Sequence, residues 1–257
     1  MKITFLGTGT STGVPEVGCR CRVCASKDGR DKRLRTSVLV ETRGKNILLD
    51  CGPDFRAQML ANPSVTRLDA VIISHEHYDH VGGLDDLRPF CIHKGLDIYA
   101  EHNVAGAIRT RMPYAFREPH FPGLPNLVLH NIKNEPFMAA GILVRPVRIL
   151  HACMEILGYR IGDMAYVTDV KNIPEEEFAK LGGLDILIID ALRKKEHPSH
   201  ESLAEALDNI ARIRPKEAYL IHMSHRMGLH EDVEKELPPH THMAYDGLQL
   251  YLDVQAV

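Results

Sequence analysis

A short stretch of the chain gathers four side chains that can bind metal ions. Residues 74–80 read SHEHYDH and directly follow the apolar run AVII. In an extended segment, His75 and His77 point to the same side of the backbone. The glycines after residue 81 let the chain turn, so Asp79 and His80 can face a second ion. Imidazole and carboxylate donors suit zinc, iron or manganese, so the spacing favours two metal ions over a solvated histidine-rich loop.

A second cluster consists of cysteines. Cys19, Cys21 and Cys24 form a C-x-C-x-x-C pattern near the start of the chain. In a reducing compartment such a cluster indicates a metal site, and structural zinc takes four soft ligands. We therefore predict one structural zinc ion, the alternative being three reduced thiols in a loop. The other cysteines (Cys51, Cys91 and Cys153) lie at or near apolar segments, and we expect them to be ordinary buried residues.

These residues must be positioned by many short strands and a few helices. Short β-rich runs alternate with amphipathic segments, which is typical of two mixed sheets with helices outside them. We predict strands over Lys2–Leu6, Ser37–Glu41, Asn46–Asp50, Ala70–Ser74, Asp97–Ala100, Leu127–His130, Ile142–Leu150, Leu157–Ile161, Met164–Thr168, Ile186–Asp190, Ala218–Ile221 and Leu248–Leu250. We predict helices over Pro53–Leu60, Leu84–Phe90, Val104–Arg111, Glu175–Leu181, Glu201–Ile213 and Glu231–Leu237, the fifth of them starting from Ser199 or His200.

Length and composition favour one globular domain. The chain has 257 residues, of which 44% are hydrophobic and 25% charged, and this is enough for one large core over residues 1–257. The formal net charge of -3 argues against a general nucleic-acid or membrane binder. The opening apolar run breaks at Gly7, too early for a signal-peptide core, so we expect a cytoplasmic protein.

The H-x-H-x-D-H pattern resembles the signature of the metallo-β-lactamase superfamily. Other features of that family recur along the whole chain: an opening strand before Gly7-Thr8-Gly9-Thr10, and Asp50-Cys51-Gly52 ahead of the histidine motif. The resemblance implies an α/β fold, the αββα sandwich of two mixed sheets flanked by helices. It also implies a two-metal site in which one group is His75, His77 and His151, the other is Asp79, His80 and His222, and Asp169 bridges both.

The same resemblance suggests a mechanism. Two divalent ions, zinc or manganese with iron as a third choice, would hold an attacking hydroxide at neutral pH and polarise the substrate. Asp50 would orient a ligand histidine, although a plain strand-end or turn aspartate is an equal alternative from the sequence.

Within the superfamily, the chain resembles the phosphodiesterases that open phosphoribosyl 1,2-cyclic phosphate. Shared features are the Gly-Thr-Gly-Thr-Ser opening, the cysteine cluster, Arg35-Thr36-Ser37, and Leu157-Gly158-Tyr159-Arg160-Ile161. That family carries a separate cysteine-bound zinc, and His225, three residues after His222, is our candidate for its fourth ligand. The resemblance implies that His200 donates a proton to the leaving oxygen, with His197 as its rival.

We therefore expect a metal-dependent phosphodiesterase acting on a small cyclic or diester phosphate, with Asp79 and His200 as catalytic residues. The partner would be that small substrate, with nucleic acid only as a substrate and no membrane; related enzymes form homodimers. One alternative is an RNA 3′-end endonuclease of the same superfamily, which usually has a long inserted arm that this sequence lacks. The other is a metal-bound binding protein without activity. A lactamase or thioesterase does not account for the histidines of residues 197–200.

Overall fold

Two seven-stranded sheets form the centre of the protein. The structure is a computed structural model and describes residues 1–92, 94–117 and 123–253. The first sheet has the strand order β14-β1-β2-β3-β4-β5-β6 and the second has the order β13-β12-β11-β10-β9-β8-β7. The strands are β1 (Lys2–Gly7), β2 (Ser37–Thr42), β3 (Lys45–Leu49), β4 (Ala70–Ile72), β5 (Leu96–Glu101), β6 (Leu127–Ile132), β7 (Phe137–Ala139), β8 (Ile142–His151), β9 (Met154–Ile161), β10 (Met164–Val167), β11 (Ile186–Asp190), β12 (Glu217–Ile221), β13 (Thr241–Met243) and β14 (Gln249–Tyr251).

Both sheets mix parallel and antiparallel pairs. In the first sheet β3 to β6 run parallel, whereas β14, β1, β2 and β3 pair in antiparallel fashion. In the second sheet β10 to β13 run parallel, and β7 to β10 pair in antiparallel fashion. Parallel strands end at the same edge of a sheet, so side chains that follow them gather there.

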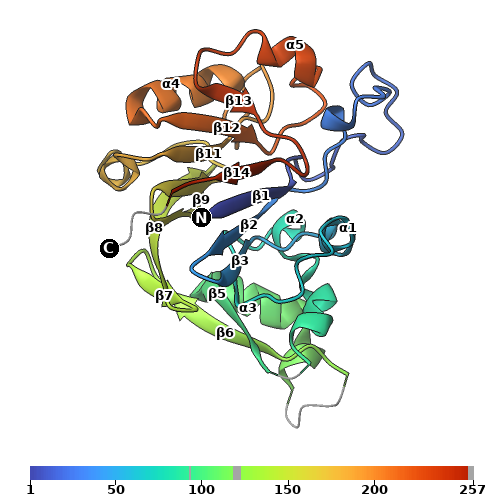
Figure 1. Cartoon of the computed structure of the whole chain (residues 1–257), viewed down its shortest axis with the longest axis vertical. Helices are drawn as coiled ribbons and strands as arrows, with labels where there is room; N and C mark the ends of the chain where they lie inside the picture. Colours follow the sequence, from blue (N-terminus) through green and yellow to red (C-terminus); the bar gives the residue numbers. More distant parts are fainter. Residues whose placement is uncertain (93, 118–122, 254–257) are drawn as a thin grey trace.

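The helices cover the outer faces of the two sheets. Figure 1 shows α4 and α5 over one side of the sandwich and α1, α2 and α3 on the other. The α-helices are α1 (Phe55–Ala61), α2 (Tyr78–Val81), α3 (His102–Arg111), α4 (Leu203–Ile213) and α5 (His230–Glu234), and the 3-10 helices are η1 (Gly29–Asp31), η2 (Leu84–Phe90), η3 (Pro113–Phe116) and η4 (Glu175–Leu181). This arrangement confirms the predicted αββα sandwich.

Three apolar clusters hold these layers together. The cluster between the sheets includes Phe5 and Ile72 of the first sheet and Tyr159 and Ile188 of the second, all fully buried. A second cluster packs the first sheet against α1 and α3, and a third packs the second sheet against α4. Burial of this apolar surface, at roughly 25 cal/mol per Å², is the main stabilising contribution.

Some predicted elements differ from the observed ones. The segments Leu84–Phe90 and Glu175–Leu181 are 3-10 rather than α-helical. Pro89 lies inside the first and lacks the N–H that an α-helix would use there. The helix predicted from Glu201 begins at Leu203, because Ser202 caps it. Neither β7 nor β13 was predicted; each has only three residues and lies at a sheet edge. Within the described residues, no helix has both the length and the apolar character needed to cross a membrane.

Candidate metal centre

Three histidines form the first group of donors. His75 and His77 lie in the extended segment between β4 and α2, and His151 is the last residue of β8. Their ring centroids lie 4.6 Å (His75–His77), 5.6 Å (His75–His151) and 5.2 Å (His77–His151) apart. One donor atom from each lies within 4.8 Å of the others, so the three could converge on one ion.

The second group contains two carboxylates and two histidines. Asp79, His80, Asp169 and His222 are all buried, and one donor atom from each lies within 4.8 Å of the rest. His80 Nε2 lies 3.2 Å from an oxygen of Asp79 and 3.2 Å from one of Asp169. His222 Nε2 lies 3.4 Å from an oxygen of each carboxylate. Donors about 2.0–2.1 Å from a tetrahedral ion are about 3.3–3.4 Å apart, so these separations fit one ion.

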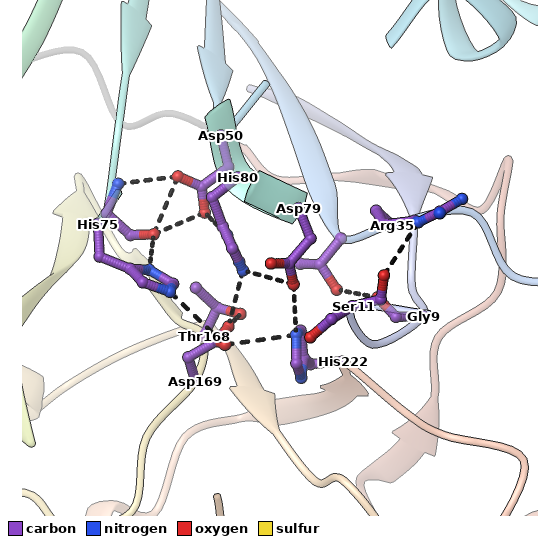
Figure 2. Close-up of polar contacts among 12 residues, drawn as sticks. Gly9, Ser11, Arg35, Asp50, His75, Asp79, His80, Thr168, Asp169 and His222 are labelled. Carbon is purple, nitrogen blue, oxygen red and sulfur yellow. Dashed lines mark hydrogen bonds and ion pairs between the residues drawn. The ribbon is translucent and has the colours of Figure 1, made fainter. Parts of the chain in front are cut away.

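Asp169 faces both groups. Besides its contacts with His80 and His222, its Oδ2 lies 3.8 Å from Nε2 of His75. Figure 2 shows this carboxylate between His75 on one side and His222 on the other. The carboxylate therefore lies between the two donor groups, with Oδ2 near His75 and His222 and Oδ1 near His80.

Buried donor atoms without a hydrogen-bond partner support metal binding. Nε2 of His75 and Nε2 of His80 are buried and have no such partner within the described part of the chain. An unpaired polar atom in a protein interior is costly, and a metal ion would satisfy both. Burial also lowers the pKa of His75, which keeps its imidazole neutral as a metal ligand must be. The donor set therefore fits divalent ions.

The Nδ1 atoms of three of these histidines are held in place by hydrogen bonds. His80 Nδ1 lies 2.7 Å from Oδ2 of Asp50, and His151 Nδ1 lies 2.8 Å from the Ser199 carbonyl oxygen. His75 Nδ1 lies 3.0 Å from Oγ of Ser74. When Nδ1 donates its proton in this way, Nε2 keeps a lone pair for an ion.

Asp50 is the centre of the supporting network. It is fully buried and accepts hydrogen bonds from the Ser74 backbone N–H (2.8 Å) and the Tyr166 hydroxyl (2.8 Å) as well as from His80. Figure 2 shows its carboxylate behind His80, on the side away from Asp169. Of the two alternatives for Asp50, the structure favours the residue that orients a ligand histidine.

Several site residues adopt a backbone conformation that is unfavourable for them. Asp50, Asp169 and His222 have φ values of 58°, 55° and 56°. Each follows the end of a strand, and a left-handed turn costs a non-glycine residue about 1–2 kcal/mol. The turn redirects the chain at the strand end, and strain of this kind is concentrated at functional sites.

His200 lies beside the second group of donors. Its ring stacks on that of His222, with centroids 4.8 Å apart and an interplanar angle of 17°. Its Nδ1 lies 2.9 Å from Oδ2 of Asp190 and 3.9 Å from Oδ2 of Asp169. Burial lowers the pKa of His200, although the charge of Asp169 opposes this effect. Asp190 was assigned no role in the sequence analysis, although an acidic residue at the end of an apolar strand was a signal that could have found it.

His197 lies close to His200, and the helix that follows starts later than predicted. The His197 ring lies 5.4 Å from that of His200, and its Nδ1 accepts a hydrogen bond from the Ser199 backbone N–H (3.3 Å). Neither Ser199 nor His200 starts α4. Ser202 forms a capping box with Glu205 there. That box satisfies N–H groups of the helix terminus.

The cysteine cluster and His225 also come together. Nδ1 of His225 lies 3.2, 3.6 and 3.3 Å from the sulfurs of Cys19, Cys21 and Cys24. A tetrahedral zinc with Zn–S bonds of about 2.3 Å would separate sulfur and nitrogen ligands by about 3.5 Å. Burial raises the pKa of the Cys24 thiol to about 11, because it disfavours the charged thiolate. A bound metal ion would stabilise that thiolate.

The segment that leads from β1 toward the cysteine loop is paired with the residue after His222. Met223, next to His222, donates from its N–H to the Thr8 carbonyl oxygen (3.0 Å) and accepts from the Thr10 N–H (3.2 Å). Cys51 and Cys91 are buried as expected. Cys153 is exposed, so that prediction is wrong: the residue lies in the short turn between β8 and β9 rather than in either strand.

Comparisons with known proteins agree with this architecture. A family model described as a beta-lactamase superfamily domain matches residues 45–223. The solved structure of a diphosphatase from the PhnP family is 37% identical to this chain, with a TM-score of 0.91 and 98% of each chain covered. The zinc-bound PqqB of Methylobacterium extorquens has 21% identity and a TM-score of 0.80, with 98% of this chain and 100% of that one covered, and supports the fold alone.

A longer relative has a different name. A Porphyromonas gingivalis (strain ATCC BAA-308 / W83) protein named octanoyltransferase is 51% identical over 260 residues. The match covers 100% of this chain but 53% of the relative, so this chain spans about half of that protein's length. The name describes a protein of which nearly half lies outside the match.

Proposed function

The chain belongs to the beta-lactamase superfamily, and on that premise we propose that it is a metal-dependent hydrolase. More specifically, we propose a binuclear phosphodiesterase acting on a small cyclic or diester phosphate. One observation carries the proposal: seven side chains from four separate segments converge, with Asp169 between the two groups. The 37% identity to a PhnP-family diphosphatase over 98% of the chain favours phosphate chemistry over other reactions of the superfamily.

We assign the ligands as the resemblance implied. His75, His77 and His151 would hold one ion, while Asp79, His80 and His222 would hold the other, with Asp169 shared. Zinc and manganese are the proposed metals and iron is a third choice, since imidazole and carboxylate donors accept each. Such ions supply Lewis acidity and lower the pKa of water to about 7. Cys19, Cys21, Cys24 and His225 would hold a structural zinc.

The chain's own residues complete the reaction. Asp79 and Asp169 place negative charge where cations bind, and both are nearly inaccessible to solvent. His200 has one nitrogen fixed by Asp190, so its Nε2 is the atom that would deliver a proton to the leaving oxygen. A poor alkoxide leaving group gains about 10²–10⁴-fold from such a donor.

A basic hollow beside the loop that carries His200 supports an anionic substrate. About 500 Å³ in volume, it is lined by Arg193, Lys194, Lys195 and Arg226. Arg193 lies in the loop that carries His200, and Arg226 lies four residues after His222. Lys194 pairs with Glu236 and Arg193 donates to carbonyl oxygens of its own loop. The charges of Lys195 and Arg226, which have no carboxylate partner in the described residues, would raise the local concentration of a phosphate ester.

The test is a screen of phosphodiesters with protein loaded with manganese or zinc. We expect hydrolysis of bis(p-nitrophenyl) phosphate and of at least one cyclic phosphate. His200→Ala should reduce kcat by roughly 10²–10⁴-fold on the poor leaving group and less on p-nitrophenolate, which needs less protonation. His197→Ala is the matched control and should change kcat much less. Metal-loaded protein without turnover would contradict the proposal and favour a binding protein.

Two other activities are outcomes of the same screen. Cleavage of transfer-RNA precursors in preference to small diesters would favour an RNA 3′-end endonuclease. Transfer or hydrolysis of octanoyl groups, with no phosphodiesterase activity, would mean that the name of the longer relative applies to this part of it. We also propose a single domain over residues 1–257, a cytoplasmic location and a homodimer, the last to be tested by light scattering.

A further inference from the structure

A hollow of about 580 Å³ lies at the end of the sandwich opposite the metal centre. Three of the proposed metal ligands lie at or just after the ends of β8, β10 and β12, whereas this hollow lies where β8, β10 and β11 begin. Arg145 precedes His151 by six residues of β8, which is about 20 Å at 3.3 Å per residue. The lining is Met1, Arg43, Arg145, Arg160, Gly162, Asp163, Ala179, Lys180, Asp185, Leu252 and Asp253.

Two of the lining arginines face each other across a strand pair. Arg145 of β8 and Arg160 of β9 are directly opposite in the antiparallel register. Like charges at such positions destabilise a sheet unless something compensates them. Within residues 1–92, 94–117 and 123–253, the Arg145 side chain makes no ion pair or hydrogen bond.

Arg160 is held rigidly and keeps one N–H group free. Its Nε and one terminal nitrogen donate to the carbonyl oxygens of Gly162, Lys180 and Gly182 at 2.7–2.8 Å. The other terminal nitrogen donates to Asp163 (3.2 Å). A guanidinium has five N–H groups, so one remains for a ligand, at a position fixed by its four hydrogen bonds.

A third arginine comes from the other sheet. Arg43 lies in the turn between β2 and β3, and its side chain likewise has no ion pair or hydrogen bond to any described residue. Arg67 donates to the Gly44 carbonyl oxygen (2.6 Å) and steadies that turn. The hollow is therefore bordered by arginines of both sheets.

The acidic lining residues cancel only part of this charge. Asp163 pairs with Arg160, and Asp185 pairs with Lys216 (2.7 Å). Lys180 pairs with Glu177 (2.7 Å). The lining groups that remain without an ion pair in the described residues are the guanidinium groups of Arg43 and Arg145 and the carboxylate of Asp253. The N-terminal amine donates to the Leu252 carbonyl oxygen (2.7 Å).

We propose that this hollow is a second binding site, distinct from the metal centre, for a ligand that carries a diphosphate or triphosphate group. Arginine forks match phosphate oxygens in pairs, and three arginines spread across a hollow of this size suit more than one phosphate. The ligand would neutralise the Arg145–Arg160 repulsion and join the two sheets. The site is too far from the metal centre for a small diester to reach both.

Calorimetry with metal-loaded protein tests the proposal. The probe is adenosine 5′-(α,β-methylene)diphosphate, whose bridge resists hydrolysis, and adenosine is the uncharged comparison. We expect binding of the diphosphate but not of adenosine. Arg145→Ala and Arg43→Ala should each weaken binding at least tenfold. Arg56→Ala is the matched control: Arg56 is exposed on α1, outside the hollow, and should leave binding unchanged.

Two further readouts separate this site from the metal centre. The inhibition constant of the same probe against bis(p-nitrophenyl) phosphate hydrolysis should be unchanged in Arg145→Ala, because inhibition reports the metal centre. Without ligand, Arg145→Ala should melt at the same or a higher temperature, since it removes a repulsion. Unchanged calorimetric binding in both arginine variants would overturn the proposal. So would a lower melting temperature, because Arg145 would then already have a partner.

Discussion

Replacement of Asp50 by asparagine tests how the ligand histidines are held. The carboxylate is fully buried, with Oδ2 near His80 Nδ1 (2.7 Å) and the Tyr166 hydroxyl (2.8 Å). Its Oδ1 accepts from the Ser74 backbone N–H (2.8 Å). Asparagine has nearly the same size, but one of its two terminal atoms is an NH₂ group that cannot accept a hydrogen bond.

Either orientation of the amide leaves a buried donor unpaired. With the nitrogen at the Oδ2 position, His80 and Tyr166 lose their acceptor; with the nitrogen at Oδ1, the Ser74 N–H loses its acceptor. One such loss costs about 1–3 kcal/mol. Loss of the charge that orients His80 should also weaken metal affinity or activity by about 10–100-fold.

The assay combines thermal melting, metal titration and hydrolysis of bis(p-nitrophenyl) phosphate. Tyr166→Phe is the matched control, since it removes one donor to Asp50 and leaves the contact with His80. It should cost about 0.5–1.5 kcal/mol of stability and change metal affinity only slightly. If Asp50→Asn keeps metal affinity and turnover within twofold of the wild type, the reasoning is refuted.

Three further predictions concern other parts of the site. Asp169→Ala should lower kcat at least about 10³-fold, because both ions lose their shared ligand and the residues of such a site act together. Residual turnover above about 10% would argue against bridging. Cys21→Ser should lower stability by about 2 kcal/mol, or roughly 4–8 °C in Tm, with turnover per folded molecule retained; equal damage to turnover in an intact fold would contradict a structural zinc. Burial raises the pKa of Glu201 to about 9, so the folded chain keeps a proton that the unfolded chain releases above about pH 4.3, and stability should fall as pH rises from about 5 to 9. Glu201→Gln should therefore raise Tm relative to the wild type at pH 8.5 but not at pH 5, and an equal shift at both pH values would show that titration is not the cause.

The sequence predicted the parts of the site that depend on local spacing. The segment 74–80 places four donors on one strand end, and three cysteines within six residues form one loop, so both clusters were visible without a fold. The resemblance to the family predicted the other three ligands, which lie at the ends of later strands: His151, Asp169 and His222. Their positions depend on β8, β10 and β12 ending at the same edge of one sheet.

Features that depend on contacts between distant segments could not be predicted in this way. The pairing of Asp190 with His200 joins a strand end to a loop ten residues later, and no periodic pattern marks it. The positive φ of Asp50 and His222 is imposed by the surrounding fold and contradicts their own preference. Similarly, an α-helix and a 3-10 helix over Glu175–Leu181 share the same residues and differ only in hydrogen-bond spacing.

The most direct test of the central claim is anomalous diffraction at the zinc edge from zinc-loaded crystals. The account predicts two peaks about 3.5–4 Å apart on either side of Asp169, and a third peak among Cys19, Cys21, Cys24 and His225. A map with no peak beside Asp169, or with His151 and His222 turned away from the peaks that are present, would contradict it.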